Sequence, residues 1–567
     1  MATGPAPGFG ANVFVSPSYA GINESGDLVF QGYLSGAGVT NDNHEALWVY
    51  QDATGPVLLA RTGRPAAGYD IFTTYEDFTH ISIDDSGVVA FGAFLEGPEI
   101  NSSNDTAYWS GTPVQLDLIA SHGAPIPGTD PAEQYWHLSG SFFHGAGGHW
   151  SFSHAYRPSV APETYDRITM LGMPDALMPY WSEDGQGVDT GFHFTSLGAP
   201  QVNASGQLAY GARTFEGAVG IYTDATGTVQ EIARLTQQAP GFDPFVTMQT
   251  LNLHELLDNG AVSFFAELVG PGVHVNSDRT YWVADPGQTP RLMIREWEYL
   301  PYQGGTARLR ILEDATHNEN GNALFTGRLN GLPGESDYGV WFGSHDNYEL
   351  VIQEGDTDPG ISGMNAHVFY NPVLNDRDLV VVSSQLRLDF HQDPFGSAVW
   401  AYRDGVRTLV VATGMMVNIA SPGETPDFRE VEVVASNGTG LDGGSVHVLN
   451  DADQLALLVY FTDDTQALIR YDLTGVFAPG DPGDLTGDGF VGVEDLDVLL
   501  ANWGNTTFAG SWRDGDADGD GVVGQGDLNV IRANWSTGTP PGGVVPEPAG
   551  AAMLLALIGL ATRRRRR

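Results

Sequence analysis

The chain has 567 residues, a formal net charge of −45, no cysteine and no lysine. This length exceeds one ordinary hydrophobic core, so we expect two or more folded units. The acidic charge disfavours nucleic acid and anionic lipid as partners, and the lack of cysteine excludes disulfides, thiolate metal sites and cysteine nucleophiles. The charge suits cation binding and solubility in a salty medium, or it reflects an acidic habit of the whole genome.

The first residues carry no visible secretion signal. Residues 1–5 contain neither a basic region nor an apolar run. Residues 2–8 instead match the loop that separates later repeats. We therefore expect a signal peptide upstream of this start site, lost through a misassigned start codon.

A short segment recurs along residues 1–473. In the first copy, we expect the Asn23 side chain to hydrogen-bond its own backbone two residues on. Gly26, three residues after Asn23, is expected to supply the positive φ of a tight turn. Where Asp378 and Asp453 replace this glycine, they must adopt the left-handed conformation at modest cost. The best copies are residues 22–30, 83–91, 202–210 and 317–325, and weaker copies carry Gly147, Gly260, Asp378 and Asp453 at the glycine position.

Two further strands recur in step with this turn. An aromatic strand such as 46–50 follows it, and then an apolar strand such as 57–61 that ends in a Gly/Pro loop. Four short antiparallel strands in roughly 60 residues, repeated eight times, predict a mainly β domain, a β-propeller of about eight four-stranded blades. Seven blades, an open solenoid and paired sandwiches are the alternatives; ring closure is favoured because it leaves no long exposed edge strand. We expect the recurrent tryptophans to pack in the core rather than to form a sugar-binding platform.

The pattern Asn-x-x-Gly-x-x-Ala-Phe, combined with Gly-x-x-Ala-Pro-Gly loops, resembles a family of bacterial surface proteins named for that repeat. The resemblance covers most of residues 1–473. It implies export and surface display, with no known activity.

A linker at 474–483 leads to a predicted calcium-binding domain at 484–536. Segments 484–495 and 516–527 have the spacing of EF-hand loops, with oxygen ligands at positions 1, 3, 5, 7 and 12. The spacing predicts two Ca²⁺ sites, the first weaker because Thr486 stands where Asp or Asn is usual; acidic turns without metal are the alternative. The predicted ligands are Asp484, Thr486, Asp488, the Phe490 carbonyl and Asp495 in the first site, and Asp516, Asp518, Asp520, the Val522 carbonyl and Asp527 in the second.

Each loop leads into a predicted helix, at 496–503 and 528–535, with apolar residues on one face. This duplicated loop and exit helix resembles a type I dockerin, which implies attachment to a cohesin-like partner. Such a small core implies that calcium supplies much of the folding free energy. The resemblance places partner contacts at Val493, Glu494, Gln525 and Gly526. Serine or threonine is usual there, so an unusual cohesin and a purely structural calcium module both stay open.

After a second linker at 537–544, residues 545–567 form the C-terminal tail. Pro546, Glu547 and Pro548 precede an apolar stretch at 549–561 and five arginines. This order closely resembles a PEP-CTERM tail, which implies transient membrane association through a short helix, removal by an exosortase, and delivery to the cell surface or exopolysaccharide matrix of a Gram-negative-type bacterium. The arginines mark the cytoplasmic side. A permanent single-span anchor is the alternative.

No catalytic residue can be assigned. His144, His149 and His154 would converge on a metal only if a turn intervenes, because their spacing alternates between the two faces of a strand. Carboxylates are too abundant for a pair to stand out, and no Gly-x-Ser-x-Gly elbow, phosphate loop or His-Glu-x-x-His motif is present. We favour a noncatalytic binding or scaffolding protein over the alternative, a glycoside hydrolase or lyase carried on the propeller.

Overall fold

The structure, a computed structural model, divides into two compact units, Met1–Thr474 and Gly475–Arg567, which are described separately. Residues are described over 6–10, 13–127, 134–138, 142–145, 147–157, 166–172, 178–182, 192–334, 336–356, 364–387, 396–419, 427–435, 448–474, 483, 485, 491–505, 515, 517 and 522–536.

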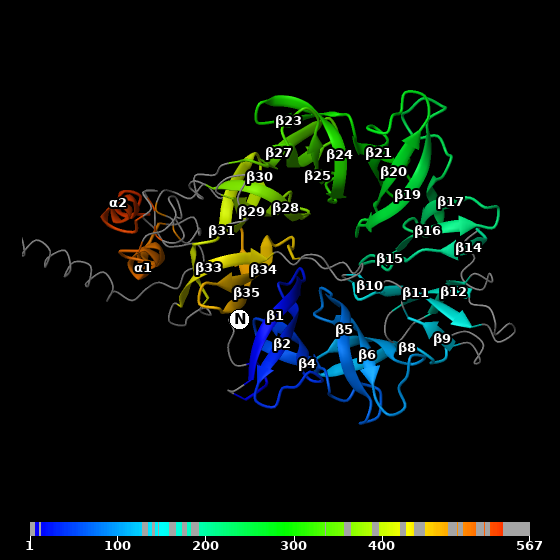
Figure 1. Ribbon diagram of the computed structural model, residues 1–567, viewed down its shortest axis with the longest axis horizontal. Helices are drawn as coiled ribbons and strands as arrows, with labels where there is room; N and C mark the ends of the chain where they lie inside the picture. Colours follow the sequence, from blue (N-terminus) through cyan, green and yellow to red (C-terminus); the bar gives the residue numbers. More distant parts are fainter. Residues whose placement is uncertain are drawn as a thin grey trace, which may run out of the picture. The chain divides into compact units, whose positions relative to one another are not determined.

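The described strands of the first unit form eight antiparallel sheets, numbered here in chain order, which follow one another around a ring (Figure 1). Each sheet comes from one continuous stretch of chain. Sheets 1 and 2 contain β1 (Val13–Ile22), β2 (Leu28–Gly36), β3 (Glu45–Gln51) and β4 (Gly55–Arg61), then β5 (Thr74–Ile83), β6 (Val89–Glu96), β7 (Thr106–Thr112) and β8 (Gln115–Ser121).

Sheets 3 and 4 have a broken inner strand, because two short strands in each pair with the same neighbour. They contain β9 (Gln134–His137), β10 (Phe142–His144), β11 (Trp150–Arg157), β12 (Asp166–Gly172) and β13 (Met178–Ser182), then β14 (Phe194–Leu197), β15 (Gln201–Val202), β16 (Leu208–Thr214), β17 (Val219–Thr223) and β18 (Gln230–Arg234). The irregular third repeat thus still forms a sheet of its own.

Sheets 5 to 8 complete the ring. Sheet 6 carries an additional strand, β23, which pairs with β24. Sheet 5 contains β19 (Thr247–Leu256), β20 (Val262–Val269), β21 (Arg279–Ala284) and β22 (Arg291–Arg295), and sheet 6 contains β23 (Tyr299–Tyr302), β24 (Gly305–His317), β25 (Ala323–Leu329), β26 (Tyr338–Ser344) and β27 (Asn347–Gln353). Sheet 7 contains β28 (Asn365–Leu374), β29 (Val380–Arg387), β30 (Gly396–Arg403) and β31 (Val406–Ala412), and sheet 8 contains β32 (Met416–Asn418), β33 (Phe428–Ala435), β34 (Gln454–Phe461) and β35 (Gln466–Asp472).

The hydrophobic core lies between neighbouring sheets. The tryptophan of the third strand is buried and stacks on the aromatic residue that ends the motif, as in Phe30–Trp48, where the ring centroids are 5.3 Å apart. The indole Nε1 of Trp48 donates to the Pro7 carbonyl of the preceding inter-sheet loop at 3.2 Å. Because the indole has both an apolar face and one donor, it ties the sheet to the loop. Fully or nearly fully buried equivalents are Trp109, Trp282, Trp341 and Trp400, so the expectation of core tryptophans is confirmed.

The ring is closed. Ala456 of β34 and Leu468 of β35 pack in the same hydrophobic cluster as Val15, Ile22 and Phe30 of sheet 1. Sheet 8 therefore lies against sheet 1, which contradicts the open-solenoid alternative. The prediction of a mainly β propeller is confirmed, and the eight described sheets correspond to the eight repeats.

In the second unit, α1 (Val493–Ala501) and α2 (Gln525–Ala533) both begin and end earlier than the predicted helices. They begin early because Asp495 and Asp527 cap the preceding backbone. A small core joins the two halves through Leu485, Val491, Leu499, Val523 and Ile531. Over the part of the chain that the structure describes, no helix is long and apolar enough to cross a membrane.

Candidate functional sites

Each motif forms a tight turn between the first two main strands of its sheet. In the first copy, Asn23 Oδ1 accepts the Asp27 N–H at 2.8 Å, and the Gly26 N–H donates to the Asn23 carbonyl at 3.0 Å. Gly26 has a φ of 80°, and Asp378 and Asp453, which replace it in later copies, have φ of 61° and 60°. The predicted turn and the predicted left-handed aspartates are confirmed, but the Asn23 side chain bonds the backbone four residues on, where two residues on was expected.

The side chain that starts a turn also reaches the turn of the next sheet. Asn23 Nδ2 donates to the Asp84 carbonyl at 2.7 Å, and Asn450 Nδ2 donates to the Asn23 carbonyl at 2.9 Å, across the junction of sheets 8 and 1. The same donation runs from Asn203 to Leu257 at 3.0 Å, from Asn318 to Asn375 at 3.0 Å and from Asn375 to Asn450 at 2.9 Å. The repeated asparagine therefore serves two sheets: one through its Oδ1 and the next through its Nδ2.

A second connection uses the residue after the first motif position, which is acidic in six of the turns. The Asp451 N–H donates to Glu24 Oε2 at 2.9 Å, and the Glu24 N–H donates to Asp85 Oδ1 at 3.1 Å. Such charge-assisted bonds join one turn to the next. The acids, which we call the carboxylate arc, run in order through sheets 5, 6, 7, 8, 1 and 2 and are Asp258, Glu319, Asp376, Asp451, Glu24 and Asp85.

Crowding of these carboxylates changes their acidity. Burial raises the pKa of Glu24 to about 7, with further contributions from the neighbouring Asp451 and Asp85. Burial likewise raises the pKa of Asp376 to about 6, together with the charges of Asp451 and Glu319. The backbone N–H donors act in the opposite direction, because they stabilise the ionised form. Part of the arc is therefore only partly ionised near neutral pH.

In sheet 3 the left-handed residue of the turn is Gly148, with a φ of 80°, and not the predicted Gly147. The Gly148 N–H donates to the Gly145 carbonyl at 3.0 Å, and the Gly145 N–H donates to the His149 carbonyl at 2.7 Å. The prediction was one residue too early, because two consecutive glycines both permit a positive φ and only the strand pairing selects one.

The three histidines of this region are separated by the turn. His144 ends β10, His149 lies in the turn with its Nδ1 3.2 Å from the Ala204 carbonyl oxygen, and His154 lies on β11. The side chains of His144 and His154 lie outside the described residues. Among the residues whose placement is described, no group of three or more His, Asp or Glu is arranged to hold a metal ion.

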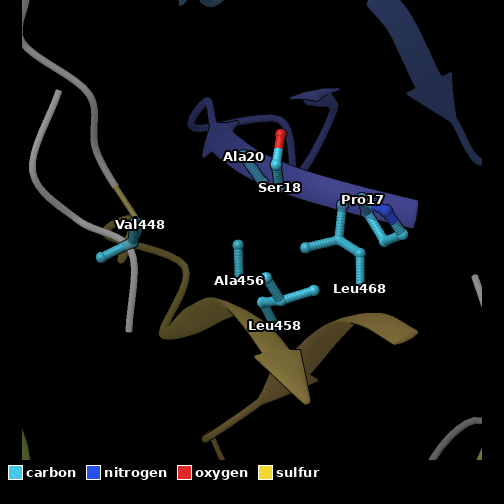
Figure 2. Close-up of a pocket in the computed structure, with 7 residues that line it drawn as sticks. All are labelled: Pro17, Ser18, Ala20, Val448, Ala456, Leu458 and Leu468. Atoms are coloured by element: carbon cyan, nitrogen blue, oxygen red, sulfur yellow. The ribbon is translucent and has the colours of Figure 1, made fainter. Parts of the chain in front are cut away.

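A shallow groove lies at the junction of sheets 8 and 1. Figure 2 shows Pro17, Ser18 and Ala20 of β1 on one side and Ala456 and Leu458 of β34 on the other, with the Ser18 hydroxyl directed away from β34; Val448 and Leu468 complete the lining. Its volume of about 260 Å³ includes space open to solvent, and its enclosed part has room for about one water molecule. Most of its lining side chains are apolar, and the groove is too small to enclose a substrate.

In the second unit, two of the predicted calcium ligands occupy equivalent positions. Asp495 and Asp527 are fully buried in the first turns of α1 and α2, and each Oδ2 accepts a backbone N–H at 2.6 Å, from Gly492 and Gly524. Val522 is also described and its side chain is exposed. The other predicted ligands lie outside the described residues; they are Asp484, Thr486, Asp488, Phe490, Asp516, Asp518 and Asp520.

The two halves of this unit are joined reciprocally. The Ser536 N–H after α2 donates to the Val491 carbonyl before α1 at 2.9 Å, and the Val523 N–H before α2 donates to the Asn505 carbonyl after α1 at 3.0 Å. The residue that precedes each helix is thus hydrogen-bonded to a residue that follows the other helix. This exchange gives the unit an internal two-fold arrangement, as the duplicated sequence implies.

The predicted partner contacts lie at the starts of these helices. Val493 is 47% exposed, and Gln525 is also exposed, whereas Gly526 is half-buried. The side chain of Glu494 and the whole sorting tail, including Pro546, Glu547 and Pro548, lie outside the described residues.

The sequence reasoning missed the carboxylate arc. The signal was present, because an acid follows the first motif position in six copies. It was hidden by the general abundance of Asp and Glu. Only the hydrogen bonds between turns separate these six carboxylates from the many other Asp and Glu side chains.

A protein-family model described as a family of unknown function (DUF7453) matches residues 2–147 and again residues 148–469. The chain belongs to this family. No curated protein matches it.

Several solved structures are similar to this chain at very low sequence identity. The β-propeller domain of the trilobed protease from Pyrococcus furiosus is 7% identical, with a TM-score of 0.36 and coverage of 70% of this chain and 96% of that one. An oligogalacturonate lyase in complex with manganese is 10% identical, with a TM-score of 0.35 and coverage of 72% and 96%. The polysaccharide lyase Uly1 is 10% identical, with a TM-score of 0.33 and coverage of 66% and 86%. These similarities concern the β-propeller fold alone.

Proposed function

We propose that this DUF7453 protein is an exported surface or matrix protein in which the propeller serves as a noncatalytic binding or scaffolding unit. The observation that carries the proposal is repetition. The same asparagine and carboxylate positions recur from sheet to sheet, in hydrogen bonds that join turns. An active site needs a unique set of groups aimed at one reacting atom, whereas a regular ring suits rigid display.

We further propose that the second unit binds two Ca²⁺ ions and attaches the protein to a cohesin-like partner. A buried carboxylate is costly unless positive charge or hydrogen bonds compensate it. Asp495 and Asp527 fit the twelfth ligand position of an EF-hand loop, since both are buried at a helix start. Calcium would be held by these carboxylates with the oxygens of the two loops, and would order α1 and α2.

The exposed Val493 and Gln525 are available for a protein partner at the calcium-ordered helix starts. Sorting by an exosortase, and delivery to the exopolysaccharide, are proposed from the order of Pro546-Glu547-Pro548, apolar stretch and arginines alone.

Binding and turnover on polysaccharides test the propeller proposal. The full chain is applied to a panel of immobilised polysaccharides, and the same samples are assayed for new reducing ends and for unsaturated products. We expect retention on one class of polysaccharide without release of products. Product release that is abolished by replacing carboxylates of a single sheet would contradict the proposal and support the glycoside hydrolase or lyase alternative.

A further inference from the structure

The junction between sheets 8 and 1, which we call the seam, differs from the other junctions of the ring. Elsewhere, consecutive sheets are joined by the chain itself, but at the seam the described contacts are all noncovalent. Among the buried side chains that the structure describes, sheet 8 contributes only Ala456 and Leu468 to the cluster it shares with sheet 1. At the junction of sheets 1 and 2, the earlier sheet instead contributes Val29, Leu47, Val49 and Ala60. Less apolar area is therefore removed from water at the seam.

Polar contacts provide much of the remaining attachment. Arg470 of β35 donates to the Gly26 carbonyl at 2.7 Å and forms an ion pair with Asp52 at 2.8 Å. Gln466 donates to Ser16, and the Asn450 and Asp451 bonds described above complete the set. Asp52 is 67% exposed, so that ion pair is screened by solvent and contributes little.

One of these contacts places a carboxylate among like charges. Glu24 of sheet 1 accepts the Asp451 N–H from sheet 8, and it faces the carboxylates of Asp451, Asp85 and Asp376 from three other sheets. Arg470 donates to the carbonyl of Gly26, two residues along the chain from Glu24. Ionised Glu24 is therefore repelled by the sheets it joins, and the groove of Figure 2 leaves part of the seam incompletely packed.

We propose that the propeller opens transiently at the seam, and that the negative charge of Glu24 promotes this opening. Protonated Glu24 keeps sheets 8 and 1 together, since the repulsion across the junction is then removed. The pH dependence of the closed state follows from the shift in the pKa of Glu24. The pKa of Glu24 is raised from 4.5 to about 7 in the closed ring, so its stabilising effect is complete below 4.5 and is lost as the pH rises through about 7.

The absence of cysteine from the chain permits a direct test. Ala456→Cys places a unique thiol in the seam, where Ala456 is 5% exposed. Ala209→Cys is the matched control, because Ala209 occupies the same motif position and is buried between sheets 4 and 5. If that control fails to fold, Ala90→Cys, at the same motif position between sheets 2 and 3, replaces it.

The rate of thiol modification is measured on the folded full chain at a fixed pH of about 8, above the pKa of about 7 of Glu24. We expect Ala456→Cys to react faster than Ala209→Cys. Adding Glu24→Gln, which keeps an oxygen acceptor, should slow the reaction at position 456 roughly threefold to tenfold and leave position 209 unchanged.

Glu99→Gln, a change of equal charge at an exposed site, should have no effect on either thiol. Equal rates at positions 456 and 209 would overturn the opening at the seam. A rate at position 456 that Glu24→Gln does not change, or that Glu99→Gln lowers equally, would overturn control by Glu24.

Discussion

At the scale of single residues, the asparagine at the first position of the motif stabilises two neighbouring sheets, and not only its own turn. Asn375 is buried, its Oδ1 accepts the Leu379 N–H at 2.9 Å, and its Nδ2 donates to Asn450 and Asp453 at 2.9 Å each. All its polar atoms are thus used by two sheets. Removing the amide would leave buried donors and acceptors without partners, which costs more than the bonds themselves.

Asn375→Ala is therefore expected to lower the free energy of unfolding by about 3 kcal/mol. The comparison is Asn101→Ala, at an exposed turn where Asn101 Oδ1 accepts only local donors from Ser103. Water replaces those bonds, so the control should lose less than about 1 kcal/mol. Urea unfolding followed by tryptophan fluorescence measures both. Equal losses in the two variants would show that the bonds between turns add nothing to stability.

At the scale of elements, the hairpin turn determines where each pair of inner strands begins. Gly321 has a φ of 80°, a conformation that costs an L side chain free energy. A Cβ at this position would also meet the end of the Arg291 side chain at 3.0 Å, which can move aside. The backbone, more than the contact, thus explains why glycine is found here.

Gly321→Ala should accordingly lower the thermal unfolding midpoint, with a loss of about 1 to 2 kcal/mol. Gly334→Ala is the matched change, because Gly334 is without a positive φ and a Cβ there meets nothing within 4 Å. That variant should be neutral or slightly more stable, since alanine restricts the unfolded chain. Differential scanning calorimetry compares the two. A Gly334→Ala variant as unstable as Gly321→Ala would refute the argument from φ.

At the scale of the whole molecule, the two units draw on different sources of stability. The first buries a large apolar core between sheets, whereas the second has a core of a few side chains around two buried carboxylates. A core that small supplies little free energy, so metal binding is expected to account for most of the stability of the second unit. Calcium removal should consequently affect one unit and spare the other.

In the full chain, EGTA is expected to abolish the helical signal of α1 and α2 and to leave the main β unfolding transition unchanged. Asp527→Asn, which removes a predicted ligand, should weaken calcium binding at least about tenfold in calorimetric titration. Asp497→Asn, an equal charge change at an exposed position of α1, should bind calcium normally. If both variants bind equally well, or if EGTA leaves the circular dichroism unchanged, the second unit does not depend on calcium.

The sequence by itself determined the features that depend on neighbouring residues. The turn at Asn23–Gly26, the strand after it and the buried Trp48 could be predicted, because turn chemistry and alternating apolar residues act within a few positions. The position of the third turn, at Gly148, could not, since both glycines satisfy the same local rule.

Only the tertiary structure decided what those turns do together. The bonds from Asn450 to Asn23 and from Asp451 to Glu24 join residues from opposite ends of the propeller, so no local pattern encodes them. The raised pKa of Glu24 follows from the same meeting of sheets, because burial and neighbouring carboxylates appear only when the ring closes. The repeated sequence specifies the turn and strands of each sheet, whereas closure of the ring determines the pKa of a carboxylate such as Glu24 at the junction.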